Sequence, residues 1–355
     1  MNSIAIIKSN LIKYPIKQLQ GKVCLSPYVS IQVGMTGDVS LCGCLTWMPS
    51  IVGNLFEQSI QDILSNADSV AIRQSMSQGT FEYCNQDQCG ILQQNALNEI
   101  ESLEPSLQRL VSDSSMHEMP HEIFLAGDVT CNLSCPSCRK KVIKNSEQKH
   151  ENNVALGKRL HANLFTTPTN KTIRLHVSTS GEIFASSILL SFVNSISPTD
   201  FSGLELCIQT NGLLMKQNWH KLGAMQDRVS KITITIDAAQ KSTYEKLRRG
   251  GKWDDIQQAL MWISKKKQQT NMSLHLRMVA QYDNYLEMAD FYQQSDALGA
   301  DVIEYSKINN WGTYTSSEFA QHDVFSPLHP EYKHAQDKLD SIKHLPKVFL
   351  SGGLS

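Results

Sequence analysis

Six short apolar runs, spaced through the last two thirds of the chain, constrain the fold more than any other feature of the sequence. Segments with helical periodicity, such as 253–266 and 285–299, separate them. A chain that alternates strand and helix in this way builds a parallel sheet with crossover helices. Six repeats fall short of eight, so we expect an α/β fold with a partial (β/α)6 TIM-like barrel. The predicted strands cover residues 122–128, 172–179, 204–212, 231–237, 273–281 and 300–308.

Polar and glycine residues gather just past the carboxyl end of each predicted strand. In barrels of parallel strands, the loops at this end of the strands build the active site. We therefore expect one site there, with the loop that follows the first strand as its first part. The polar groups are Ser180-Gly181-Glu182, Thr210-Asn211-Gly212, Asp237, Gln281, and Lys307 with Asn309.

The loop "DVTCNLSCPSCRKK" places Cys131, Cys135 and Cys138 within eight residues. Two thiols would make a disulfide or redox pair and four would close a metal site, whereas three leave one coordination position open. Thiolates select zinc or iron–sulfur clusters, but structural zinc takes four ligands and no histidine follows closely. A [4Fe–4S] cluster on three cysteines has one free iron, which the amino and carboxylate groups of S-adenosylmethionine can chelate. An incidental or zinc-binding triplet is the alternative.

Composition limits the partners and the compartment. Lys plus Arg number 33 and Asp plus Glu 34, so the net charge of -1 favours neither a nucleic acid nor an anionic membrane as partner. The first 17 residues resemble neither a signal peptide nor a membrane span. We expect a cytoplasmic protein whose nine cysteines stay reduced and bind metal.

The part of the chain before the predicted strands has a different pattern. Residues 28–43 alternate as a hairpin, and a helical segment follows near residue 60. A small domain with little hydrophobic core and five cysteines indicates an α+β domain that a bound metal stabilises. We predict this domain with its linker at 1–118, the barrel at 119–345 and a flexible tail at 346–355. The five cysteines are Cys24, Cys42, Cys44, Cys84 and Cys89.

The cysteine triplet and three later segments together resemble the radical S-adenosylmethionine enzymes over residues 122 to about 310. These segments are "STSGEIFAS", "QTNG" and "ITIDAAQKSTYEKLRRGG". The resemblance implies a [4Fe–4S] cluster on the triplet and S-adenosylmethionine bound beside it. Ser137 stands where many relatives have an aromatic residue.

The same resemblance implies roles for the residues around the cofactor. Ser180, Gly181 and Glu182 would face its methionine ammonium, and Thr210 and Asn211 its ribose side. Thr235 would contact the ribose hydroxyls, and Arg248 would bind the carboxylate as a charge-assisted pair, with Arg249 as the alternative.

The cysteines of the first domain resemble those of the auxiliary-cluster module called SPASM or, in its shorter form, Twitch. Cys24, Cys42, Cys84 and Cys89 would ligate a second [4Fe–4S] cluster that transfers electrons. Zinc on the same four thiols is the alternative metal. Cys44 points to the same face of a strand as Cys42 and is the alternative ligand.

The expected reaction starts when an external one-electron reductant of the flavodoxin or ferredoxin type reduces the first cluster. Cleavage of S-adenosylmethionine then yields a 5′-deoxyadenosyl radical that abstracts hydrogen from a substrate carbon. We expect a ribosomally synthesised peptide as substrate; a small polyol, amino sugar or sugar nucleotide is the second hypothesis. A non-catalytic iron–sulfur or zinc-stapled binding protein is the third. Substrate-side candidates are Gln281, Lys307, Asn309 and Trp311.

Overall fold

The computed structural model describes residues 13, 19–144, 147–177 and 180–354. The chain divides into two compact units, each assembled from several segments. The first unit comprises Met1–Asp128, Glu151–Thr179 and Ser191–Glu205, and the second comprises Val129–His150, Ser180–Leu190 and Leu206–Ser355. The domain boundaries predicted at residues 118 and 345 stay predictions.

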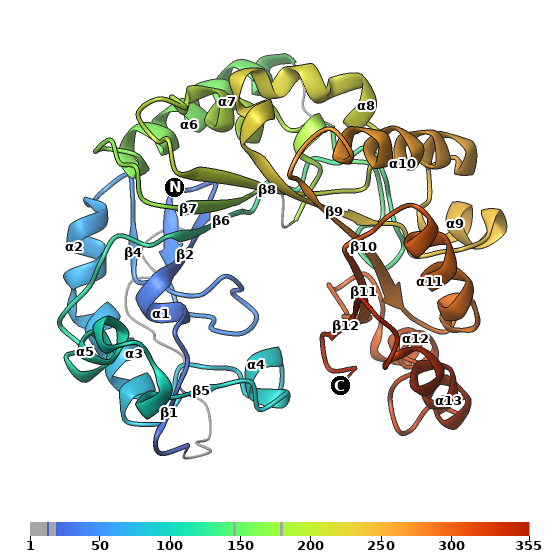
Figure 1. The fold of residues 1–355 in the computed structure, drawn as a ribbon, viewed down its shortest axis with the longest axis horizontal. Coiled ribbons are helices and arrows are strands. Elements are labelled where there is room, and N and C mark those ends of the chain that lie inside the picture. Colours follow the sequence, from blue (N-terminus) through green and yellow to red (C-terminus); the bar gives the residue numbers. More distant parts are fainter. Residues whose placement is uncertain (1–12, 14–18, 145–146, 178–179, 355) are drawn as a thin grey trace. The chain divides into compact units, whose positions relative to one another are not determined.

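The second unit contains five parallel strands in the order β8-β9-β10-β11-β12 (Figure 1). Four of them confirm predicted strands, and the fifth, β12, lies within the predicted tail and pairs with β11. The strands are β8 (Leu204–Thr210), β9 (Val229–Thr235), β10 (Ser273–Ala280), β11 (Val302–Lys307) and β12 (Val348–Ser351).

Helices connect these strands in the order that the periodicity predicts. α10 and α11 pack against β10, as Figure 1 shows for the orange helices of this unit. The helical elements are η3 (Ile183–Ala185), α7 (Ser187–Ser195), α8 (Met215–Asn218), η4 (Trp219–Arg228), α9 (Lys241–Leu247), α10 (Trp253–Lys267), η5 (Tyr285–Glu287), α11 (Met288–Ala297), α12 (Ser316–His322) and α13 (Tyr332–Ile342).

Burial alternates along β10 with the period of a strand. Leu274, Leu276 and Met278 are completely buried, whereas the residues between them are half-buried. Successive side chains of a strand point to opposite faces of its sheet. One face of β10 therefore belongs to the apolar core, and the other, with His275 and Arg277, is polar.

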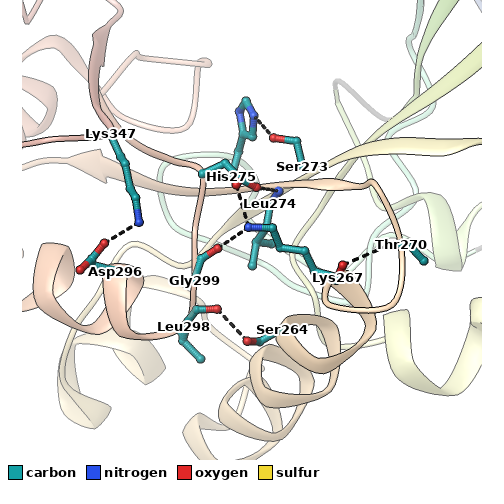
Figure 2. A network of polar contacts seen from close by, with 11 residues as sticks. Ser264, Lys267, Thr270, Ser273, Leu274, His275, Asp296, Leu298, Gly299 and Lys347 are labelled. Carbon is teal, nitrogen blue, oxygen red and sulfur yellow. Dashed lines mark hydrogen bonds and ion pairs between the residues drawn. The ribbon is translucent and has the colours of Figure 1, made fainter.

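A polar network ties the amino-terminal ends of the strands to the ends of the helices (Figure 2). Lys267, the last residue of α10, donates to the Gly299 carbonyl (2.6 Å) and to Asp301 Oδ1 (2.7 Å). The other carboxylate oxygen of Asp301 accepts the backbone N–H of Leu274 (2.7 Å). This network lies at the start of β10, so it stabilises the fold at the end of the strand opposite to the predicted site.

The first unit contains strands in the order β7-β6-β2-β3-β4 and a separate pair, β1-β5. The predicted hairpin is confirmed as the antiparallel pair of β2 and β3. β2 also pairs in parallel with β6, which the sequence did not predict. The strands are β1 (Lys22–Val23), β2 (Ser30–Gly34), β3 (Asp38–Ser40), β4 (Gly53–Asn54), β5 (Asn98–Glu99), β6 (Glu122–Ala126) and β7 (Ile173–Val177).

β6 and β7 confirm the first two predicted strands, although positions 178 and 179 of the second lie outside the described residues. The α/β fold of mostly parallel strands alternating with helices is thus confirmed. The helical elements of this unit are α1 (Ser26–Val29), α2 (Ile60–Ser65), α3 (Ala67–Ser77), α4 (Gly90–Gln93), η2 (Ile100–Ser102), α5 (Pro105–Ser112) and α6 (Glu147–Leu164).

Candidate functional site

The three cysteines of the second unit lie on a tightly turned loop. The Cys138 N–H donates to the Cys135 carbonyl (2.9 Å), and the Cys131 N–H donates to the Ile143 carbonyl (3.0 Å). Cys131 and Cys135 are buried around Leu133, whereas Cys138 is exposed. Burial raises the pKa of the Cys131 thiol, and the neighbouring Glu182 and Cys135 charges add to that rise. Two thiols of this loop are thus shielded from water, and the third faces it.

Glu182 is completely buried beside this loop, and other residues of the chain bind its carboxylate. The Thr210 hydroxyl lies 2.8 and 2.9 Å from the two carboxylate oxygens, and the N–H groups of Asn211 (2.8 Å) and Phe184 (3.2 Å) donate to one oxygen each. Burial raises the pKa of Glu182. Its own N–H donates to the Thr130 carbonyl (2.8 Å). In this structure, Glu182 joins the loops that follow β7 and β8 to the start of the cysteine loop.

Asn211 extends this network to the cysteines. Its side-chain N–H group donates to Asn132 Oδ1 (2.8 Å) and lies 3.7 Å from the Cys131 sulfur. Its Oδ1 accepts the N–H of Leu213 (3.1 Å). The structure therefore brings the predicted residues Glu182, Thr210 and Asn211 together around Cys131.

Arg248 is buried and lies between a carboxylate and a cysteine. Its Nε is 3.1 Å from Asp237 Oδ2, and its Nη1 is 3.6 Å from the Cys135 sulfur. Burial works to lower the pKa of Arg248, but the Asp237 and Cys135 charges raise it above its ordinary value. Nη2 has no hydrogen-bond partner within the described part of the chain, so it can donate to a ligand. Thr235, at the end of β9, is half-buried.

Arg249, the sequence's alternative to Arg248, contacts the cysteine loop instead. Its side chain donates to the Ser134 hydroxyl (3.1 Å) and to the Lys140 carbonyl (3.2 Å). Its own carbonyl accepts the Ser134 N–H (3.0 Å). This geometry makes Arg249 a support for the loop and leaves Arg248 as the candidate for a ligand carboxylate.

The substrate-side candidates fall into two groups. Gln281 is 2% exposed, and its Oε1 has no partner among the described residues. Lys307 forms an ion pair of 3.0 Å with Asp323, whose other carboxylate oxygen is also buried and unpartnered in the described part of the chain. Asn309 and Trp311, in contrast, are exposed.

Sequence reasoning missed the roles of two residues near this site. It placed Asp237 among the polar groups past the strand ends without giving it a role, yet its carboxylate holds Arg248 and accepts the Val279 N–H (2.7 Å). It gave no role to Tyr314, which interacts electrostatically with Arg249 and Cys135. A buried acidic residue with a positive φ of 64° was a detectable signal only once the backbone was known.

The cysteines of the first unit form one neighbourhood. Electrostatic interactions connect every pair within the predicted set of Cys24, Cys42, Cys84 and Cys89. Burial raises the pKa of all four thiols. Cys44 interacts with Cys42 and Cys89, and its sulfur lies 2.9 Å from the Thr46 hydroxyl. Thiolates are the donors that iron–sulfur clusters use, so these residue types fit such a cluster, and the choice between Cys42 and Cys44 stays a prediction.

The residue types of the three-cysteine loop in the second unit also fit a cluster, because its three thiols are soft donors on one short loop. Over the described ranges, no three or more His, Cys, Asp or Glu side chains are placed to hold a metal ion. The individual ligands of both sites therefore stay predictions. None of the described helices has the length and apolar character needed to cross a bilayer.

Comparison with known proteins identifies the first cysteine group. Residues 24–90 match the family model of SPASM, an iron–sulfur cluster-binding domain. The predicted SPASM module is thereby confirmed, and with it iron–sulfur cluster binding by this part of the chain. A comparison with curated proteins found no match.

The fold is similar to several solved structures at low sequence identity. SuiB of Streptococcus suis bound to its precursor peptide SuiA matches at 9% identity and a TM-score of 0.44, over 95% of this chain and 73% of that one. Native anSMEcpe with bound AdoMet matches at 15% identity and a TM-score of 0.37, over 51% of this chain and 50% of that one. A radical SAM methyltransferase from Sphaerobacter thermophilus matches at 12% identity and a TM-score of 0.38, over 62% of this chain and 63% of that one.

This chain covers 54% of SuiB in another crystal structure of that protein, so it spans about half to three quarters of these relatives. Each TM-score is below 0.5, so the proposals that follow rest on this chain's own residues.

Proposed function

We propose that this protein is a radical S-adenosylmethionine enzyme that uses an auxiliary iron–sulfur cluster and modifies a peptide. The observation that carries the proposal is the three-thiol loop whose neighbours Glu182 and Asn211 tie it to the ends of the parallel strands. Three thiols with a supporting network and a free arginine donor suit a cluster that also binds a nucleotide cofactor. When bound, the cluster supplies an electron that cleaves S-adenosylmethionine to a radical able to abstract hydrogen.

Cys131, Cys135 and Cys138 would hold this cluster, and Cys24, Cys42, Cys84 and Cys89 the auxiliary one. Arg248 would orient the cofactor through the N–H groups of its unpartnered Nη2, while Asp237 keeps the guanidinium in place. Glu182 would act indirectly, because its carboxylate already accepts three donors and has no exposed surface. Its role is to hold Thr210 and Asn211 against the cysteine loop.

Gln281 and Lys307 would face the substrate. Gln281 Oε1 and one oxygen of Asp323 are buried acceptors without a partner among the residues described, and buried acceptors are costly unless a donor reaches them. Backbone N–H groups of an extended peptide are such donors. The match of residues 24–90 to the SPASM iron–sulfur cluster-binding domain supports the auxiliary cluster in this proposal.

The proposed reaction needs an external one-electron reductant of the flavodoxin or ferredoxin type. It also needs reduced thiols, which favours the cytoplasm as its compartment. An auxiliary cluster on Cys24, Cys42, Cys84 and Cys89 would supply an electron acceptor, so we expect an oxidised peptide product.

The decisive experiment reconstitutes the protein with iron and sulfide without oxygen. We expect about eight irons per chain, falling to about four when Cys131, Cys135 and Cys138 are replaced together by Ala, since each cube holds four irons. Dithionite and S-adenosylmethionine should yield 5′-deoxyadenosine with the wild type and none with the triple variant.

Cys207→Ala is the matched control, because Cys207 is a buried strand residue outside both cysteine groups. It should keep both the iron and the product. Absence of 5′-deoxyadenosine from iron-loaded wild type would refute the enzyme proposal. Product formation that responds to polyols or sugar nucleotides, and not to peptides, would refute the substrate class alone.

A further inference from the structure

Arg139 follows the last cysteine of the loop and joins three separate parts of the second unit. One end of its guanidinium donates to the Val129 carbonyl, where the chain enters the loop. Nη2 donates to the Ser180 carbonyl (2.8 Å) and lies 3.3 Å from the Cys138 sulfur. A planar guanidinium has several donors in a fixed fork, so it can make these contacts together.

The contact with Cys138 places a permanent positive charge beside one particular thiol. Cys138 is the exposed cysteine of the three, whereas Cys131 and Cys135 are buried. The Arg139 charge also interacts with Cys131 and Cys135. Arg139 therefore contacts the Cys138 sulfur directly and interacts electrostatically with the other two cysteines of the loop.

The two neighbouring arginines have different positions. Arg249 contacts the Ser134 hydroxyl and the carbonyls of the loop, so its charge supports the backbone. Arg248 lies near the Cys135 sulfur, but its charge is balanced by Asp237 at 3.1 Å. Among the residues that the structure describes, the acceptors that Arg139 contacts are two carbonyls and a sulfur, and none of them is a carboxylate.

We propose that Arg139 is a positioning residue that fixes Cys138 against the Ser180 loop and raises the reduction potential of the cluster on Cys131, Cys135 and Cys138. The inference rests on the proposed function, because it assumes that this loop holds the cluster. Reduction adds a negative charge to the cluster, and a nearby cation with a hydrogen bond to a ligand sulfur stabilises that charge. Arg139 would thus make the first electron transfer easier.

The test is a redox titration of the reconstituted holoprotein, followed by electron paramagnetic resonance. The variants are Arg139→Gln, Arg139→Lys and the control Lys141→Gln, which removes an exposed charge from the same loop. The signal that S-adenosylmethionine shifts identifies the first cluster, and the auxiliary cluster serves as an internal reference.

At a fixed ambient potential, we expect the ratio of reduced to oxidised first cluster to be about tenfold lower in Arg139→Gln than in the wild type. For a one-electron couple, this corresponds to a reduction potential lower by about 59 mV. The potential of the auxiliary cluster should not change. The reduction potential of the first cluster in Arg139→Lys should lie closer to that of the wild type, because lysine keeps the positive charge and loses only the forked donors of the guanidinium. Lys141→Gln should match the wild type.

An unchanged potential in iron-loaded Arg139→Gln would overturn the inference, as would an equal shift in Lys141→Gln. Loss of the first cluster from both Arg139 variants would also overturn it, since the role would then be structural. A wild type without iron on this loop would instead refute the proposed function, so the two failures are distinguishable.

Discussion

Replacing Glu182 by Gln tests whether its buried carboxylate holds the candidate site together. The substitution keeps the shape of the side chain and converts one acceptor oxygen into an amide donor. Backbone N–H groups contact both oxygens in the native structure, that of Phe184 at Oε1 and that of Asn211 at Oε2. In neither orientation can the amide therefore accept hydrogen bonds from both of these N–H groups. One buried N–H is left without an acceptor.

An unsatisfied buried donor costs about 1–3 kcal/mol, so we expect Glu182→Gln to lower the free energy of unfolding by about 2 kcal/mol. Glu287→Gln is the matched control. The N–H groups of Ala239 (2.7 Å) and Gln240 (3.1 Å) donate to the same oxygen of Glu287, and the Thr243 hydroxyl donates to the other. An amide can keep the first two bonds and the hydroxyl can turn to accept, so we expect a loss of about 1 kcal/mol or less.

Urea unfolding of the reduced apoprotein, followed by tryptophan fluorescence, measures both losses. Trp219 is buried in the second unit with its ring centroid 6.2 Å from that of Phe184, so it reports on this region. Glu182→Gln should also lower iron retention by the three-cysteine loop, whereas Glu287→Gln should not. Equal stability losses in the two variants, or a Glu182→Gln protein as stable as the wild type, would refute the reasoning.

Four further predictions concern other parts of the chain. Cys42→Ala should reduce the bound iron from about eight to about four atoms per chain, and Cys44→Ala should keep about eight; the reverse result in iron analysis would make Cys44 the ligand. Gly43→Ala should lower the free energy of unfolding of the apoprotein by about 1–3 kcal/mol in thermal unfolding, because the new Cβ would lie 2.8 Å from an aromatic ring of β6. Lys267→Met removes two hydrogen bonds near the start of β10 and should cost about 1–2 kcal/mol in urea unfolding with unchanged iron content. Burial works to raise the pKa of Glu122, but a histidine and an arginine on β7 lower it below its ordinary value. The apoprotein should therefore lose stability as the pH falls through the folded pKa of Glu122, and Glu122→Gln should make this loss smaller.

The sequence by itself determined the order of the strands and helices and the two groups of cysteines. Both signals are local. The alternation that buries Leu274, Leu276 and Met278 is a period of two within one strand. The three thiols of the loop are neighbours because only a few residues separate them along the chain. The positions of the polar loops followed as well, since parallel strands place their carboxyl ends at one edge.

Only the tertiary structure decided what the individual side chains do at that edge. The sequence offered Glu182 as an acceptor for a ligand, but Thr210, 28 residues away, occupies its oxygens. It left Arg248 and Arg249 as alternatives, and their partners Cys135 and Ser134 lie 113 and 115 residues away. It did not predict that β2 would pair with β6, or that Arg139 would reach Ser180. Each of these contacts depends on how distant loops pack, and no local period in the sequence records that packing.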